Sequence, residues 1–194
     1  MNKNSLKEET QNSIADALIG LSLSKPLSSI SVTELCENAG VSRMAFYRNF
    51  ASKEDVLLWK MNSLVEEYRR ATSTARAKGS PWFGIDHLSV CCLFLKQNNN
   101  FIDSLYRCGY AQLLVDTIAK YMIDTWGNGT PKGDYVLAAF AGSICSTYAK
   151  WKERDYRESP QQLADIISRF YTALPAPKEQ IKSNTHTRSS LSKA

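Results

Sequence analysis

The chain has 194 residues, of which 43% are hydrophobic and 22% are charged, a balance typical of a globular protein with one large domain or two small ones. Its longest nearly continuous apolar stretch, residues 136–145, is about half of the ~20 residues that a membrane-spanning helix needs. The polar N-terminus has no apolar signal core, so we expect a cytoplasmic protein. Five cysteines without a CxxC pair argue against a disulfide framework and favour a reducing compartment.

The formal net charge of +5 does not identify a partner, because it is spread unevenly. Cations and acids number seven and seven in residues 1–60, thirteen and eleven in residues 61–175, and four and one in residues 176–194. Within the balanced N-terminal part, Arg43, Arg48 and Lys53 form a stretch without any acid. This local asymmetry indicates an anionic partner more clearly than the total charge does.

Apolar residues at helical spacing predict a first helix over residues 6–23, which ends before Pro26. Ser31 and Glu34 have the spacing of a capping box, and they open a short second helix. Gly40 follows where a left-handed residue closes a helix. These signals predict two helices joined by a short loop.

Ser42 is the expected N-cap of a third helix that runs to about Asn49, with Phe46 and Phe50 on its inner face. Ser52 and Asp55 repeat the capping pattern and begin a long helix that we expect to continue to about residue 78. The second and third helices therefore form a helix–tight turn–helix unit, the arrangement in which the second helix enters the major groove of DNA.

Side chains on the outer face of this third helix have the chemistry that reads DNA. Arg43 can donate two hydrogen bonds to guanine, and Met44 offers an apolar contact to a thymine methyl group. Phosphate oxygens suit the remaining polar and charged side chains, namely Thr33, Tyr47, Asn49 and Lys53.

The run from Ile30 to Leu57 resembles the DNA-binding region of TetR-family transcriptional regulators, and the match in spacing and order extends over about residues 6–60. Its markers are Gly40-Val41-Ser42, Phe46-Tyr47, Phe50 and Lys53-Glu54. The resemblance implies an all-α homodimer with an N-terminal three-helix helix-turn-helix domain and a C-terminal helical domain for ligand binding and dimerisation. It also implies a palindromic double-stranded DNA operator and repression that a ligand relieves.

The resemblance implies two groups of DNA contacts. Arg43, Met44 and Tyr47 would face bases or their sugars, and Thr33, Ala45, Arg48, Asn49 and Lys53 would lie along phosphates. Cys36 and Asn49 depart from the family pattern: alanine usually stands at the first position, and histidine or tyrosine at the second.

Beyond the third helix, the sequence predicts helices at about residues 81–98, 101–107, 110–126, 134–153 and 160–173. We expect a DNA-binding domain in residues 1–60, a regulatory and dimerisation domain in residues 61–175, and a disordered tail in residues 176–194.

The helix from Asp134 carries small residues that would allow close packing with a partner helix, so it is a candidate for a dimeric four-helix bundle with the helix after Pro160. Packing within one protomer is the alternative explanation of the same pattern. The candidate interface residues are Phe140, Ile144, Tyr148, Ile167 and Phe170.

Aromatic residues concentrate between residues 81 and 126, which suggests a pocket for a small apolar or aromatic effector, with ordinary core packing as the alternative. The candidate pocket residues are Trp82, His87, Phe94, Tyr106, Tyr110 and Tyr121. Cysteines at 91, 92, 108 and 145 leave thiol or soft-metal sensing open, although adjacent cysteines on a helix point about 100° apart.

The sequence has no phosphate-binding glycine loop and no HExxH or GxSxG motif, so we expect no enzyme, cofactor or metal site. The prediction is a DNA-binding transcriptional regulator, a repressor released by a small molecule. Two alternatives stay open: a regulator controlled by a protein partner or by thiol or metal sensing, and an enzyme or carrier whose N-terminal unit only resembles a DNA-binding head.

Overall fold

The computed structural model describes residues 3–172, and all regular secondary structure in this range is helical, as the all-α prediction required. The elements are α1 (Lys3–Ser22), a 3-10 helix η1 (Leu27–Ser29), α2 (Val32–Ala39), α3 (Arg43–Asn49), α4 (Lys53–Ala71), α5 (Ser73–Ala77), α6 (Ile85–Gln97), α7 (Asn99–Arg107), α8 (Ala111–Trp126), α9 (Pro131–Glu153) and α10 (Pro160–Thr172). The predicted tail at 176–194 lies outside the described residues. None of the described helices is long and apolar enough to cross a membrane.

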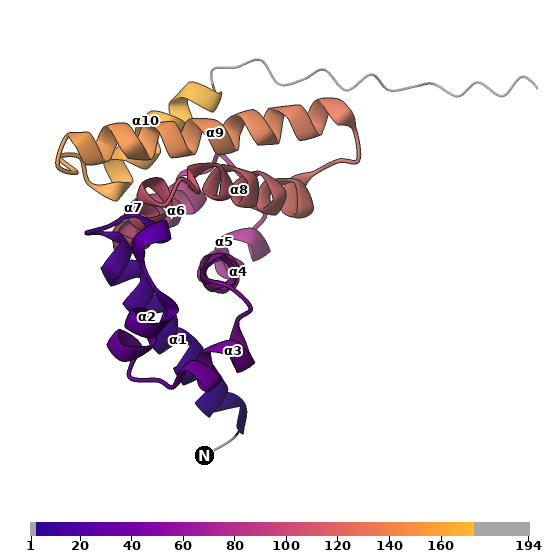
Figure 1. Ribbon diagram of the computed structural model, residues 1–194. Helices are drawn as coiled ribbons and strands as arrows, with labels where there is room; N and C mark the ends of the chain where they lie inside the picture. The colour runs from indigo at the N-terminus through magenta and orange to yellow at the C-terminus, as the bar shows by residue number, and fades with distance from the viewer. Residues whose placement is uncertain (1–2, 173–194) are drawn as a thin grey trace, which may run out of the picture.

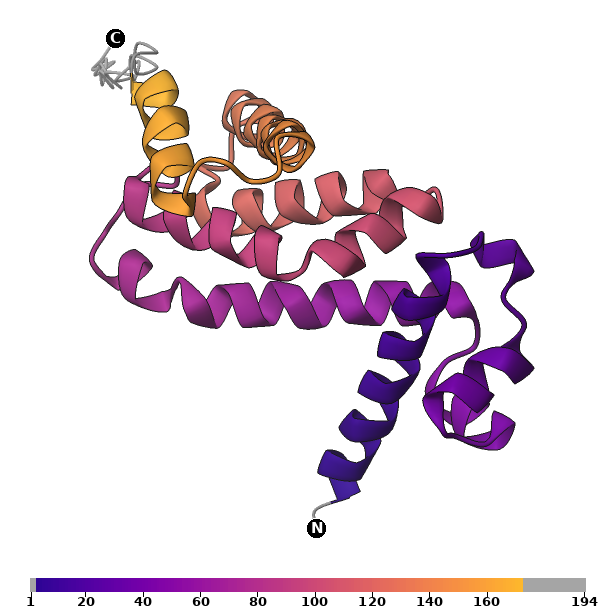
Figure 2. The same cartoon turned by 90° about the vertical axis from the view of Figure 1, so that its left-hand side faces the viewer.

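Helices α1–α3 form a head at the N-terminal end of α4, and α6 and α8 pack against the rest of α4 (Figure 1). Figure 2 shows α4 and α5 in one line beneath α6–α10, with α1 leading away from the upper helices. Within the upper layer, α9 packs along α8, and α10 packs against α6. Helix α4 therefore belongs to both parts of the molecule.

The helix boundaries in the head follow from local hydrogen bonds. The Ser42 hydroxyl accepts from the Ala45 amide at 3.1 Å, and Ser52 and Asp55 form a complete capping box at the start of α4. Gly40 ends α2 with a φ of +65°, a conformation that side chains with a Cβ rarely adopt. The loops that orient α3 are thus fixed at both of its ends.

The predicted capping box at Ser31 is only half formed. Its hydroxyl accepts from the Glu34 amide at 3.1 Å, but the Glu34 carboxylate forms an ion pair with Lys25 instead of returning to the backbone of Ser31. The prediction was wrong on this second bond, because a lysine from the preceding loop competes for the carboxylate.

The long helix expected over residues 53–78 is interrupted at Thr72, which divides it into α4 and α5. The buried Thr72 hydroxyl donates to the Tyr68 carbonyl at 2.9 Å and accepts from Arg76 at 2.9 Å. Such bonds from a threonine hydroxyl to the preceding turn compete with the helical backbone bonds. The break therefore coincides with a polar contact inside the protein.

The core of the head is formed by side chains from α1, α2, α3 and α4. Phe46 is fully buried, its ring centroid lies 6.1 Å from that of Phe50, and Phe50 lies 5.9 Å from Trp59 of α4. Ile14 and Leu35 close the same cluster from α1 and α2. These contacts hold α3 against α4 and leave its opposite face outward.

Candidate functional site

The outward face of α3 carries solvent-exposed apolar, aromatic and cationic side chains. Met44 is 81% exposed and Tyr47 is 54% exposed, and Arg43 and Arg48 are exposed beside them. Thr33 is exposed on the neighbouring α2. The structure thus exposes five of the eight predicted DNA-contacting residues, four of them on α3.

Three of the predicted DNA contacts are also engaged within the head. Asn49 donates from its side-chain nitrogen to the Ala45 carbonyl at 2.8 Å, and both residues are half-buried. The ring of Tyr47 packs edge-on against buried Phe46 at 5.2 Å. Tyr47 therefore has a supported position from which to contact DNA, whereas Asn49 has part of its hydrogen-bonding capacity in use.

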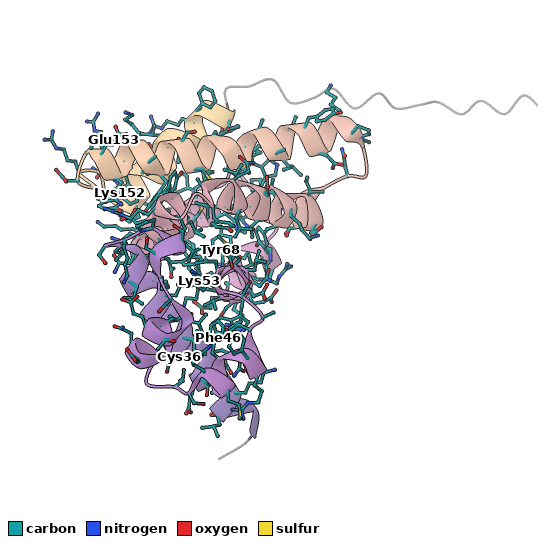
Figure 3. The ribbon with its side chains drawn as sticks, viewed as in Figure 1. Cys36, Phe46, Lys53, Tyr68, Lys152 and Glu153 are labelled. Atoms are coloured by element: carbon teal, nitrogen blue, oxygen red, sulfur yellow. The ribbon has the colours of Figure 1, made fainter. Side chains whose placement is uncertain are left out.

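Lys53 lies at the junction between the head and α4 and connects them (Figure 3). Its ammonium group donates to the carbonyls of Leu27 and Ile30, each at 2.6 Å. This role was not expected from the sequence, which predicted only a phosphate contact. No acid lies within ion-pair distance of Arg43 or Arg48 among residues 3–172, so their charges remain uncompensated.

The second part of the site is an apolar cavity of about 90 Å³ enclosed by α4, α6, α7, α8 and α9. Of the six predicted pocket residues, Trp82, His87, Phe94 and Tyr121 line this cavity. The prediction was wrong for Tyr106, which lines a separate outer groove, and for Tyr110, which is absent from the cavity wall.

The sequence prediction missed the contribution of α4, which supplies one wall of the cavity. The lining residues from this helix are Met61, Leu64, Val65 and Tyr68. Figure 3 shows Tyr68 on α4 beneath the upper helices, with Lys53 nearer the head on the same helix. The apolar residues at 61, 64, 65 and 68 have helical spacing, and this was the signal that could have placed α4 at the cavity.

His87 is the unusual polar residue of the cavity wall. Its side chain is 2% exposed, and neither ring nitrogen has a hydrogen-bond partner. The ring stands edge-on to Trp126 at a centroid distance of 5.2 Å. Burial is the main cause that lowers the pKa of His87; the Ser80 carbonyl opposes it, and the charges of Arg76, which lowers the pKa, and Asp86, which raises it, have smaller effects. The imidazole is therefore neutral near pH 7.

Tyr121 connects the cavity wall to the break between α4 and α5. Its hydroxyl accepts from Arg76 at 2.6 Å, and its ring lies 5.4 Å from Tyr68 and 5.2 Å from the Arg69 guanidinium. Arg76 also donates to the Thr72 hydroxyl and to the Arg69 carbonyl. A change in the position of Tyr121 would therefore disturb contacts at the end of α4.

The thiols of Cys91, Cys92 and Cys145 lie in apolar surroundings that favour their protonated, unreactive form. Burial raises the pKa of Cys92 to about 12 and that of Cys145 to about 11, and it raises the pKa of the cavity-lining Cys91 further. Within residues 3–172, no three His, Cys, Asp or Glu side chains gather as a metal site would require. The raised pKa values weigh against the thiol-sensing alternative.

Four of the five predicted interface residues lie inside the protomer, which corrects the predicted dimer surface. Phe140, Ile144, Tyr148 and Ile167 are buried, and Phe140 packs against Trp82 with a centroid distance of 4.6 Å. Only Phe170, at 64% exposure, is accessible. The accessible apolar residues of α9 and α10 are Tyr135, Val136, Ala138, Ala139, Ile166 and Phe170.

Comparison with known proteins identifies the head. Residues 14–58 match the family model described as "Bacterial regulatory proteins, tetR family". No curated protein matches the chain. A solved structure named "Dihydroxyacetone kinase operon activator DhaS" is similar in fold, with 19% sequence identity, a TM-score of 0.57, and coverage of 84% of this chain and 94% of that chain. The matched residues run from α1 into the N-terminal part of α4, so the head is a DNA-binding domain of the tetR type.

Proposed function

We propose that the protein is a repressor that a small apolar or aromatic molecule releases from DNA by binding in the cavity. The observation that supports this function best is that α4 takes part in both sites. Lys53 connects the N-terminal end of α4 to η1 of the head, and Tyr68 lines the cavity about four turns further along the same helix. A ligand that displaces the cavity wall would therefore tilt the head.

A second contact also supports coupling between the cavity and the head. Helix α7 supplies Phe101 and Ile102 to the cavity wall and packs against α1. Near the C-terminal end of α7, Cys108 lies close to Ser22 at the end of α1 and to the backbone of Leu27. The head is thus attached at two places, through α4 and through α7, and both of these helices line the cavity.

We further propose a homodimer in which the exposed apolar faces of α9 and α10 meet those of a second copy. Two recognition helices would then enter successive major grooves of a palindromic operator, about 34–36 Å apart. In this arrangement residues 1–60 act as the DNA-binding domain and residues 61–175 as the regulatory domain, with α4 crossing the boundary. A cytoplasmic location follows from access to DNA.

Selection of binding sites from random double-stranded DNA with the full-length protein tests the DNA-binding part. We expect enrichment of a two-fold symmetric sequence whose binding weakens steeply with salt. A reporter gene placed behind that sequence then gives the sign of regulation: lower expression supports repression, and higher expression would overturn it. Failure to enrich any symmetric sequence would contradict the dimeric DNA-binding proposal.

Screening for release tests the ligand part. The protein is mixed with labelled operator DNA and a panel of uncharged aromatic compounds, and both thermal stability and DNA release are recorded. Compounds that raise the melting temperature and release the DNA support the proposal. If no compound stabilises the protein, while a protein partner from the same cell changes DNA binding, control by a protein partner replaces this function.

A further inference from the structure

We propose that the cavity selects uncharged aromatic molecules that donate one hydrogen bond, and that His87 is the residue that accepts it. This inference rests on the proposed function of the cavity as the effector site, and it specifies the chemical class of the effector. It is carried by the hydrogen-bonding state of His87, the absence of charged groups from the described cavity wall, and the aromatic character of that wall.

A buried imidazole without a partner is costly, because the ring gives up its hydrogen bonds to water and receives none in return. His87 is 98% buried, and both ring nitrogens lack a partner. A leucine or phenylalanine would pack at this position without that cost. The cavity beside the ring is the place from which a missing partner can arrive.

The neutral form of the ring defines what this partner must offer. A neutral imidazole has one N–H donor and one nitrogen lone pair. The Ser80 carbonyl lies near enough to the ring to oppose the lowering of its pKa, although it forms no hydrogen bond with either ring nitrogen. No donor reaches the lone pair among the described residues. The unmet requirement is therefore for a hydrogen-bond donor, such as a hydroxyl group on the ligand.

The cavity wall also excludes charged ligands. No aspartate, glutamate, lysine or arginine is among the described residues that line it. Arg76, whose charge acts on His87, donates to the hydroxyls of Thr72 and Tyr121 and to the Arg69 carbonyl. A carboxylate inside the cavity would lose its hydration without gaining a free cationic partner, which is strongly unfavourable.

The remaining lining favours a flat ring. Tyr68, Phe94 and Tyr121 contribute aromatic faces from α4, α6 and α8, and Trp82 and Trp126 add two more. The cavity of about 90 Å³ is smaller than the roughly 150 Å³ of a cavity that holds benzene, so an aromatic ligand must displace part of the wall as it enters, as the proposed release mechanism requires. Aromatic ligands gain edge and face contacts from such walls beyond their apolar area.

Four naphthalene probes test this chemistry on the full-length protein, with quenching of tryptophan fluorescence as the measure of binding, since Trp82 and Trp126 line the cavity. The probes are 2-naphthol, which donates a hydrogen bond, 2-methoxynaphthalene, which only accepts, naphthalene, and 2-naphthoate. We expect 2-naphthol to bind about tenfold more tightly than the methoxy compound and naphthalene, and 2-naphthoate to bind weakest. Equal binding of the first three, or tightest binding of the carboxylate, would overturn the inference.

Two variants then assign the preference to a residue. His87→Leu removes the acceptor at similar volume, so the preference for 2-naphthol should disappear while naphthalene still binds. Thr117→Val, which removes a hydroxyl from another part of the cavity wall, should keep the preference. The reverse pattern would assign the selectivity to Thr117 and overturn the role of His87. Should His87→Leu fail to fold, the ratio between 2-naphthol and its methyl ether in the unaltered protein still decides the chemistry.

Release of operator DNA is measured separately with the same probes. Selective binding of 2-naphthol without release of DNA would support the chemistry of the cavity and contradict the proposed function. Release by all uncharged probes alike would support the proposed function and contradict the selectivity. The two proposals can therefore fail independently.

Discussion

The DNA-binding head and the helices around the cavity differ in how completely they are packed. In the head, the caps at α3 and α4 are formed, Lys53 is bonded to two carbonyls, and Phe46 is fully enclosed. The upper part instead contains a cavity and a buried histidine without a partner. A surface that contacts DNA bases requires fixed geometry, whereas a ligand cavity requires unfilled space. The head is therefore densely packed, and the helices around the cavity are not.

The largest expected effect is on the densely packed head. Phe46→Ala removes the fully buried ring of α3 that packs against the rings of Tyr47 and Phe50. We expect a loss of about 3–5 kcal/mol in the free energy of unfolding, together with loss of DNA binding. Urea denaturation measures the first effect. Met44→Ala, on the exposed face of the same helix, is the control and should leave stability unchanged; a small effect of Phe46→Ala would show that the head is packed more loosely than described.

A matched pair of enlargements on α4 compares the two halves directly. Val56 is buried in the head, and Val65 lines the cavity nine residues further along the same helix. Val56→Phe should destabilise the protein by about 1–3 kcal/mol through overpacking. Val65→Phe should cost close to nothing because the ring enters existing space, and it should weaken the binding of cavity ligands. Equal costs from thermal unfolding would contradict the difference in packing.

The reading surface and its support respond differently to the loss of a charge. Arg43→Ala should weaken operator binding by about 1–3 kcal/mol and relax the preference at one symmetric base position. Lys53→Ala should weaken binding to all sequences alike and also lower stability by about 1–3 kcal/mol, because two half-buried carbonyls lose their donor. Binding to operator variants and urea denaturation separate the two. An unchanged base preference after Arg43→Ala would contradict its assignment to a base.

Much of the head could be predicted because its signals are local. Ser42, Gly40 and the pair Ser52 and Asp55 set helix ends through bonds within four residues, and the structure confirms each of them. The break at Thr72 and the second bond expected of Glu34 were missed. Each involves a side chain from further away in the sequence, Tyr121 beside the Thr72 hydroxyl in one case and Lys25 beside the Glu34 carboxylate in the other.

The candidate site shows the same difference between residues that one helix determines and residues that depend on how several helices pack. Because the outward residues of α3 share a single helical face, the exposure of Arg43, Met44 and Tyr47 could be predicted from their spacing alone. The cavity requires knowing which faces of five helices converge, and aromatic content cannot distinguish Phe94, which lines it, from Tyr106, which faces an outer groove. The buried face of α9 was taken for a dimer surface because small and apolar residues suit both kinds of packing.

The smallest expected effect is on the pH dependence of stability, and it comes from His87 in the cavity wall and not from the head. Burial lowers the pKa of His87 in the folded protein below its ordinary value of 6.5. As the pH falls through 6.5, the unfolded chain takes up a proton at this residue before the folded chain does, so stability is lost on acidification. Denaturation between pH 8 and 5 should therefore show a smaller loss in His87→Leu than in the unaltered protein. His186 is present in both chains and cancels in the difference. Identical pH dependence would mean that the ring finds a partner for its charged form, and it would remove the reason for assigning the acceptor in the cavity to a neutral imidazole.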